Sequence, residues 1–250
     1  MTSTPPIRER RLGGRTIRIA DDKPTFWDRV EAGTWEPGTL AALAPRLGPD
    51  ATFLDIGAWV GPLTLLAASS GARVMAVEAD PSAQDQLRRN LATNPDLAAR
   101  VEVIAAAIAP SPGEVRLGAR RKAGDSMSSV LLAGSTESWT ARAVTPAMLA
   151  ERLGKVGRLV VKIDIEGAEY DLLPHIGPLL ANQDTVVLVS FHPVILGQAG
   201  MRDVETRLAA ALVSFAGWQA VAVDGEVGSG PVPDVLLADP TIETWLLSRS

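Results

Sequence analysis

The chain has 250 residues, 46% of them hydrophobic, which is enough for one α/β domain with a sizeable core or for one domain plus a short arm. Its formal net charge of -5 argues against a protein whose main partner is nucleic acid, because phosphate contacts need a broad basic surface. It has no cysteine, which excludes disulfides and cysteine nucleophiles, and no run of ~18 apolar residues, so we expect a cytoplasmic protein without a membrane partner.

The chain begins with a basic arm. Gly13-Gly14 is followed by alternating side chains, Thr16 and Arg18 against Ile17 and Ile19, a pattern that is typical of a β-hairpin. The arginines of this arm either discourage pairing at a sheet edge, which we favour, or clamp an anionic substrate. A short helix and a loop follow. Because a loop before a cofactor domain often covers the cofactor, Trp35 and Glu36 are candidates to line the site.

The first strand of the main domain ends in an acidic residue and a glycine turn. Helical apolar spacing follows this turn, so the segment predicts a strand, a tight turn and a helix start. Such a junction offers backbone N–H groups and the positive end of a helix dipole to a ligand. A dinucleotide fingerprint has glycine where this chain has Trp59, so no pyrophosphate cradle is evident. An acid here suits a cationic ligand such as S-adenosylmethionine. The predicted cofactor contacts of the turn are Asp55, Gly57, Ala58 and Gly61.

The second strand ends in Glu78, twenty-one residues beyond Gly57. At about this separation an acid meets the ribose hydroxyls in βαβ cofactor folds, and a carboxylate can accept both vicinal hydroxyls at once. Glu78 is therefore predicted to bind the ribose of the cofactor.

Two segments after Glu78 supply further candidates. The third strand, residues 101–108, contains a run of alanines that gives either room for a flat adenine or tight helix–sheet packing. Residues 118–136 are rich in Gly, Ser and charge, and a mobile surface loop is favoured there over contact with cofactor or substrate. The candidate contacts in these segments are Ala106, Ala107, Asp125 and Ser126.

A second acidic motif follows the strand predicted at residues 158–163. Asp164 and Glu166 are two residues apart, so in an extended segment they lie on one side. In a doubly wound sheet this carboxyl end is the binding edge, which makes both residues catalytic candidates and Asp164 also a cofactor contact. Glu169 and Asp171 are expected to be charges at a helix start, as the helix dipole favours.

A fifth strand, residues 184–191, is followed by His192, one of two histidines in the chain. A lone histidine is most often a structural residue that is held by hydrogen bonds. At the active edge of a sheet it is also a candidate catalytic residue or acceptor contact.

The alternation of strands and helices predicts a doubly wound α/β fold with a mostly parallel sheet. Segments 218–223, 234–238 and 244–248 are expected to be the last strands, and the final hairpin is expected to add an antiparallel strand. We expect residues 1–48 to form the N-terminal hairpin arm and a helical cover, and residues 49–250 to form the main domain.

The sequence resembles the FkbM-type S-adenosylmethionine-dependent methyltransferases over roughly residues 50–195. The resemblance rests on Leu54-Asp-Ile-Gly-Ala-Trp-Val-Gly61, on Val77-Glu-Ala-Asp-Pro81 and above all on Val161-Lys-Ile-Asp-Ile-Glu-Gly-Ala-Glu-Tyr170. It implies a Rossmann-like methyltransferase fold, with a mostly parallel seven-stranded sheet that has an antiparallel C-terminal strand. It also implies methyl transfer, usually to a hydroxyl, often in natural-product or sugar tailoring. Trp59 departs from the family, whose members usually carry a smaller or polar residue there.

The expected reaction is attack of a substrate oxygen on the sulfonium methyl group, with a small molecule as the acceptor. An aliphatic hydroxyl is a poor nucleophile while protonated, so a base or a metal should assist, and the candidates are His192, Asp164 and Glu166. Mg²⁺ at Asp164 would need further oxygen ligands that the sequence does not clearly provide, so metal-free assistance is favoured.

Three other functions compete with O-methylation. An N-methyltransferase is the near neighbour, while an NAD-linked oxidoreductase is disfavoured by Trp59. A non-catalytic binding protein with a cofactor fold is disfavoured because the acids and glycines of the cofactor motifs are intact. The sequence is compatible with a monomer or a homo-oligomer.

Overall fold

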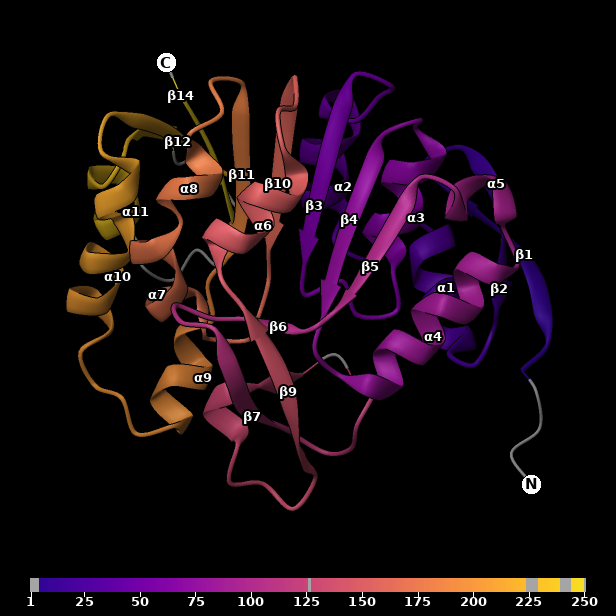
Figure 1. Cartoon of the computed structure of the whole chain (residues 1–250), viewed down its shortest axis with the longest axis horizontal. Coiled ribbons are helices and arrows are strands. Elements are labelled where there is room, and N and C mark those ends of the chain that lie inside the picture. The colour runs from indigo at the N-terminus through magenta and orange to yellow at the C-terminus, as the bar shows by residue number, and fades with distance from the viewer. Residues whose placement is uncertain (1–4, 126, 224–228, 239–243, 250) are drawn as a thin grey trace.

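The computed structural model describes residues 5–125, 127–223, 229–238 and 244–249, and its central feature is a large mixed sheet (Figure 1). Among the described residues this sheet has eight strands in the order β13-β12-β14-β11-β10-β3-β4-β5. Strands β3, β4, β5, β10 and β11 are parallel to one another, and β14 runs antiparallel between β11 and β12. The strands are β3 (Ala51–Ile56), β4 (Arg73–Glu78), β5 (Val101–Ala105), β10 (Arg158–Ile163), β11 (Thr185–Ser190), β12 (Trp218–Ala222), β13 (Ser229–Pro231) and β14 (Thr244–Arg249).

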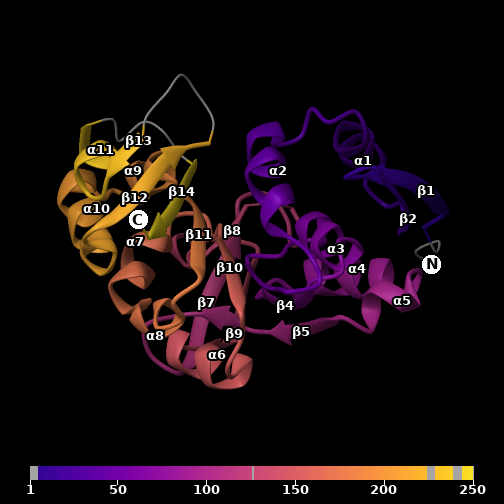
Figure 2. The same cartoon turned by 90° about the horizontal axis from the view of Figure 1, so that it is seen from above.

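Helices cover both faces of this sheet because its inner strands are apolar on both sides. In β10, Leu159, Val161 and Ile163 belong to one buried cluster and Val160 to the other. The cluster that contains Val160 packs against α1 (Pro24–Glu31), α2 (Pro37–Leu43), α3 (Pro62–Ser69), α4 (Pro81–Ala92) and α5 (Pro95–Ala98). The other packs against α6 (Pro146–Leu153), α7 (Glu169–Leu172), α8 (Gly177–Leu180), α9 (Pro193–Gln198), α10 (Val204–Leu212) and α11 (Asp234–Ala238). Figure 2 shows these two groups of helices in opposite halves of the molecule. The 3₁₀ turns are η1 (Ala44–Arg46), η2 (Val130–Leu132), η3 (Leu173–His175) and η4 (Val213–Phe215).

The N-terminal arm is a two-stranded hairpin of β1 (Ile7–Leu12) and β2 (Arg15–Ala20), with the predicted glycine turn. Two side chains of the α4 region hold the free edge of β2. Asn94 Oδ1 accepts the N–H of Arg18 at 2.9 Å, and Asn90 Oδ1 accepts the N–H of Ala20 at 3.0 Å. An edge strand whose backbone groups are bonded in this way is not open to pairing with another chain.

A second sheet lies beside the carboxyl ends of β3, β4 and β10 (Figure 1). Its four strands have the order β6-β9-β7-β8 and are β6 (Ala107–Ile108), β7 (Gly113–Ala119), β8 (Ser128–Ser129) and β9 (Ser138–Val144). The sequence analysis expected a loop at residues 118–136, which is wrong in part because β8 and η2 lie there, and it assigned no structure to residues 138–144. Polar and apolar residues alternate from Ser138 to Ala143, as is typical of a strand, and β7 pairs with this segment from Gly113↔Ala143 to Gly118↔Ser138.

Two further expectations require correction. The main sheet has eight strands among the described residues rather than seven, because Ser229–Pro231 adds β13 beside β12. Residues 234–238 form α11 instead of a strand, since the N–H groups of Leu236 and Leu237 both donate to the carbonyl of Pro233. A short apolar run does not distinguish helix from strand by its period alone. Within the described ranges, no helix is long and apolar enough to cross a membrane.

Candidate functional site

A pocket of about 520 Å³ opens at the carboxyl edge of the main sheet. The ends of β3, β4, β5, β10 and β11 supply its floor, and the segment from α1 to α2 supplies one wall. It brings together most of the residues that the sequence analysis selected. These are Trp35, Asp55, Gly57, Ala58, Glu78, Ala106, Ala107, Asp164, Glu166 and His192, with Glu36 and Asp125. Ser126 lies outside the described residues.

Gly57 is glycine because two adjacent strands meet there. Its φ is 78°, and a Cβ at this position would lie 1.9 Å from the carbonyl oxygen of Asp164. The N–H of Gly57 donates to the carbonyl of Val77 at 2.9 Å, which fixes the turn against β4. Only glycine therefore allows the ends of β3 and β10 to approach this closely.

Gly61 is not among the residues that line the pocket, although it was predicted to bind the cofactor. Its φ is 88°, and a Cβ would lie 2.3 Å from Cδ1 of Leu87 in α4. Glycine suits this left-handed backbone, and a Cβ would also displace the end of the Leu87 side chain.

Three described residues other than glycine have a positive φ, and all three line the pocket. They are Glu36 at 43°, Trp59 at 50° and Glu166 at 56°. Strained backbone conformations of this kind tend to cluster at functional sites, because the surrounding structure must hold them in place.

Glu78 both braces the turn and faces the pocket. Its Oε2 accepts the N–H of Trp59 and its Oε1 accepts the N–H of Asp80, each at 2.7 Å. Burial raises the pKa of Glu78 to about 7, more than these two backbone hydrogen bonds lower it. Each carboxylate oxygen keeps a second lone pair for a ligand.

Lys162 is the central countercharge of the site, and the sequence analysis did not select it. Its Nζ donates to the carbonyl of Gly57 at 2.7 Å and lies 3.7 Å from Asp55 Oδ1 and 3.4 Å from Asp164 Oδ2. Burial alone would lower the pKa of Lys162, but Asp164 and Asp55 outweigh it and raise the pKa. The sequence did contain a signal for this role, which is a charged residue inside an otherwise aliphatic strand.

Asp55 is almost completely buried, and burial raises its pKa although Lys162 acts in the opposite direction. Its Oδ2 accepts the hydroxyl of Thr64 at 2.6 Å. Burial would also raise the pKa of Asp164, but Lys162 and His192 outweigh it, so the pKa of Asp164 is lowered. Lys162 thus lowers the pKa of both neighbouring carboxylates, but only at Asp164, where His192 acts in the same direction, does this exceed the effect of burial.

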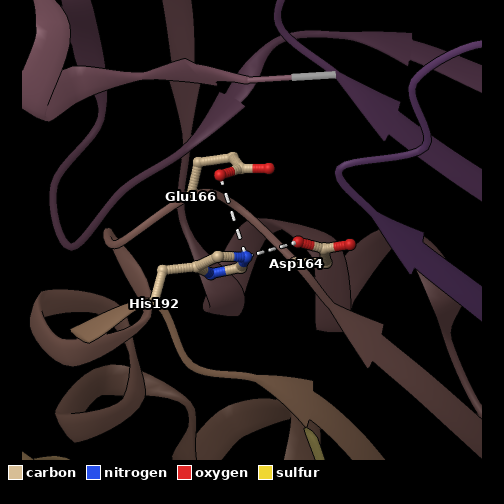
Figure 3. Close-up of side chains that lie close together, drawn as sticks. All are labelled: Asp164, Glu166 and His192. Atoms are coloured by element: carbon tan, nitrogen blue, oxygen red, sulfur yellow. Dashed lines mark ion pairs between the residues drawn. The ribbon is translucent and has the colours of Figure 1, made fainter. Parts of the chain in front are cut away.

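Asp164, Glu166 and His192 form a compact cluster at one end of the pocket (Figure 3). The Nε2 atom of His192 lies 3.5 Å from Asp164 Oδ1 and 3.8 Å from Glu166 Oε2. One ligand atom from each residue lies within 4.8 Å of the other two, which is a separation that can hold a metal ion. Burial raises the pKa of Glu166 to about 7.

Glu169 lies in the first turn of α7, as predicted, but it is also fully buried and holds this cluster. Its carboxylate accepts the N–H groups of Ile165 at 2.8 Å and Gly167 at 2.9 Å, and Oε1 lies 3.1 Å from Nδ1 of His192. Burial would lower the pKa of His192, but the bond to Glu169 and the nearby carboxylates raise it to about 10. Asp171 is exposed and pairs with Arg207 at 3.1 Å, as expected of a surface charge.

An aromatic cover forms one wall of the pocket. Phe26 packs edge to face with Trp35 and Trp59, with ring centroids 5.4 Å and 4.6 Å apart. The indole N–H of Trp59 and the ammonium of Lys23 both donate to the carbonyl of Gly124. Trp59 therefore ties the cover to the loop after β7 instead of leaving the open space that glycine would give. No residue of β1 or β2 lines the pocket, although both strands are described in full.

No protein-family model matches the chain, and no curated protein matches its sequence. Among solved structures it is similar to precorrin-6y C5,15-methyltransferase from Geobacter metallireducens GS-15, with 14% identity, a TM-score of 0.44 and coverage of 86% of this chain and 87% of that one. It is also similar to the glycopeptide N-methyltransferase MtfA, with 18% identity, a TM-score of 0.35 and coverage of 63% and 57%. A mutant of MtNAS in complex with S-adenosylmethionine shows 14% identity, a TM-score of 0.39 and coverage of 91% and 66%. Likeness at this level assigns no family and no activity to the chain.

Proposed function

We propose that the protein is an S-adenosylmethionine-dependent methyltransferase that acts on a hydroxyl of a small molecule. The observation that carries the proposal is that the Gly57 turn, Glu78 and the Asp164, Glu166 and His192 cluster line one pocket. Its volume of about 520 Å³ is in the usual range of small-molecule sites.

The cofactor is proposed to lie along the carboxyl ends of β3, β4 and β5. Glu78 would accept the ribose hydroxyls, and the small side chains of Ala106 and Ala107 leave room for the adenine ring. The methionine end would lie over Gly57 and Ala58, where the carboxylate of Asp164, whose pKa is lowered, suits a cationic ligand. Trp35 would cover the cofactor from the aromatic wall.

The acceptor is proposed to enter beside the Asp164, Glu166 and His192 cluster. Its oxygen attacks the sulfonium methyl group in line, so that the new O–C bond forms as the C–S bond breaks. The hydroxyl proton passes to the carboxylate of Glu166, whose pKa is raised to about 7, and the products are a methyl ether and S-adenosylhomocysteine. The protein mainly has to hold donor and acceptor at attack distance, which supplies much of the rate. An acceptor from natural-product or sugar tailoring fits a pocket that is partly aromatic and partly acidic.

Calorimetric titration of the purified chain tests the cofactor. We expect micromolar binding of S-adenosylhomocysteine and no binding of NADH, because Trp59 fills the place where a pyrophosphate would need glycine. Binding of NADH alone, or of neither compound, would contradict the proposal.

The pH dependence of cofactor binding tests the assignment of Glu78 to the ribose. Because its pKa is raised to about 7, this carboxyl is mostly protonated at about pH 6 and mostly ionised at about pH 8. The ribose hydroxyls donate to the ionised form, so S-adenosylhomocysteine should bind roughly tenfold more tightly at the higher pH. In Glu78→Gln we expect this slope to disappear and binding at the higher pH to weaken by ~1–3 kcal/mol.

The slope is the decisive measurement for Glu78. Glutamine can accept only one of the two backbone N–H groups that the carboxylate now accepts, so the affinity alone would mix two effects. Exposed Glu114→Gln in β7 is the matched control and should keep the slope. An unchanged slope in Glu78→Gln would show that another group binds the ribose.

In the ligand-free protein, the contribution of Glu78 to the free energy of unfolding should fall as pH rises from about 5 to about 8. The reason is that the carboxyl of Glu78 keeps its proton to a higher pH in the folded state than in the unfolded state.

A further inference from the structure

We propose that Asp164, Glu166 and His192 form a binding site for one divalent transition-metal cation, at the acceptor end of the pocket. The cation site itself depends only on these three side chains. Its role in holding the acceptor oxygen rests on the proposed methyltransferase function.

The three ligand atoms come from two neighbouring strand ends and converge on one point (Figure 3). Asp164 and Glu166 follow β10, and His192 follows β11, which is paired with β10 in register up to Ile163↔Val189. All three side chains are partly exposed, and all three line the pocket. Metal–ligand bonds of ~2.0–2.2 Å place neighbouring ligand atoms ~3–4 Å apart, so the observed separations need only small side-chain shifts.

The imidazole of His192 is oriented as a metal ligand would be. Nδ1 faces the buried carboxylate of Glu169, which is itself fixed by the N–H groups of Ile165 and Gly167. Histidines that bind metals nearly always donate their other ring N–H to such a carboxylate, which directs the remaining nitrogen at the metal. Here the remaining nitrogen, Nε2, is the atom that faces Asp164 and Glu166.

Glu166 supplies an independent observation. Its Oε2 atom is buried and has no hydrogen-bond partner, which is costly for a carboxylate oxygen. Lys162 cannot satisfy this atom, because Lys162 lies against the carbonyl of Gly57 and against Oδ2 of Asp164. Oδ1 of Asp164 therefore stays directed at the cluster, and a cation there would contact both Oδ1 of Asp164 and Oε2 of Glu166.

The donor set indicates which kind of cation fits. Two carboxylates and one imidazole suit Mn²⁺ or a similar transition metal better than Mg²⁺ or Ca²⁺, which favour oxygen ligands only. Three protein ligands leave coordination positions open toward the pocket, where an acceptor oxygen can bind. This changes the expectation from the sequence, in which Asp164 lacked partners, because the fold brings a second carboxylate and a nitrogen to it.

Binding of Mn²⁺ to the full chain in the absence of any cofactor tests the site, by calorimetry and by electron paramagnetic resonance. We expect one Mn²⁺ per chain with micromolar affinity, weaker binding of Mg²⁺, and a nitrogen hyperfine coupling from the imidazole. Glu166→Gln should weaken Mn²⁺ binding by tenfold or more, and His192→Gln should also abolish the nitrogen coupling. The matched control is Asp171→Asn, an exposed carboxylate on the next helix, which should bind as the wild type does.

Two results would overturn the cation site. One is that the wild type binds no Mn²⁺. The other is that Glu166→Gln and His192→Gln bind Mn²⁺ as tightly as the wild type does, in samples whose thermal unfolding transitions show that both variants are folded. The test is separate from that of the proposed function, because S-adenosylhomocysteine binding is measured without metal and Mn²⁺ binding without cofactor. Failure of either leaves the other result standing.

Discussion

Gly57→Ala is expected to abolish measurable binding of S-adenosylhomocysteine and to lower the free energy of unfolding by about 3 kcal/mol. The added methyl group would lie 1.9 Å from the carbonyl oxygen and 3.0 Å from the carbonyl carbon of Asp164. These are backbone atoms, so the ends of β3 and β10 would have to separate, and the turn would lose its place beside β4. Calorimetric titration and urea unfolding measure the two effects.

Gly217→Ala is the matched control for Gly57→Ala. Gly217 has φ 81°, close to the 78° of Gly57, but no atom lies within 4 Å of the position of its Cβ. It should therefore show only the strain of a left-handed backbone, ~1–2 kcal/mol, and should keep cofactor binding. The difference between the two variants isolates the clash with Asp164. Normal cofactor affinity in Gly57→Ala would mean that the glycine turn is not the binding site.

Lys162→Met is expected to lower the free energy of unfolding by ~3–5 kcal/mol, the usual cost of removing one partner from a buried ion pair. Methionine keeps the apolar stem of the lysine but leaves Asp55 without its countercharge, in a position where only 1% of the residue is exposed. The carbonyl of Gly57 would also lose its 2.7 Å hydrogen bond. Urea unfolding at neutral pH measures the loss.

A second substitution identifies the cause of this loss. Asp55→Asn removes the stranded charge, so the double variant Lys162→Met with Asp55→Asn should recover much of the stability. Exposed Lys155→Met is the matched control and should change the free energy of unfolding by less than about 0.5 kcal/mol. If the double variant is less stable than Lys162→Met by the full cost of Asp55→Asn alone, the Asp55–Lys162 pair does not stabilise the fold.

Most of the pocket could be predicted because parallel strands end at one edge of a sheet. Asp55, Glu78, Asp164 and His192 each lie at or just beyond the end of an apolar strand, and strand ends can be located from the sequence. Their meeting in one pocket then follows from topology alone. The chemistry that each contributes beyond a charge could not be predicted in this way.

The interactions of Lys162 and Glu169 show where the sequence pattern ends. Lys162 lies within β10 and Glu169 begins α7, so the local sequence predicts only a strand residue and a helix-start residue. Their partners lie on other elements: Asp55 on β3 faces Lys162, and His192 beyond β11 faces Glu169. Such a partner is set by packing between elements, and the local sequence pattern does not specify that packing.

The sequence by itself determined the strands with strong apolar runs, the glycine turn, the hairpin arm and the acids of the binding edge. Each of these follows from short-range chemistry: period, backbone freedom or capping. The tertiary structure alone decided which strands pair in the second sheet, and that Glu166 and His192 join Asp164 around one point. These depend on contacts between segments that are separated in the chain, and the local pattern of each segment does not specify such contacts.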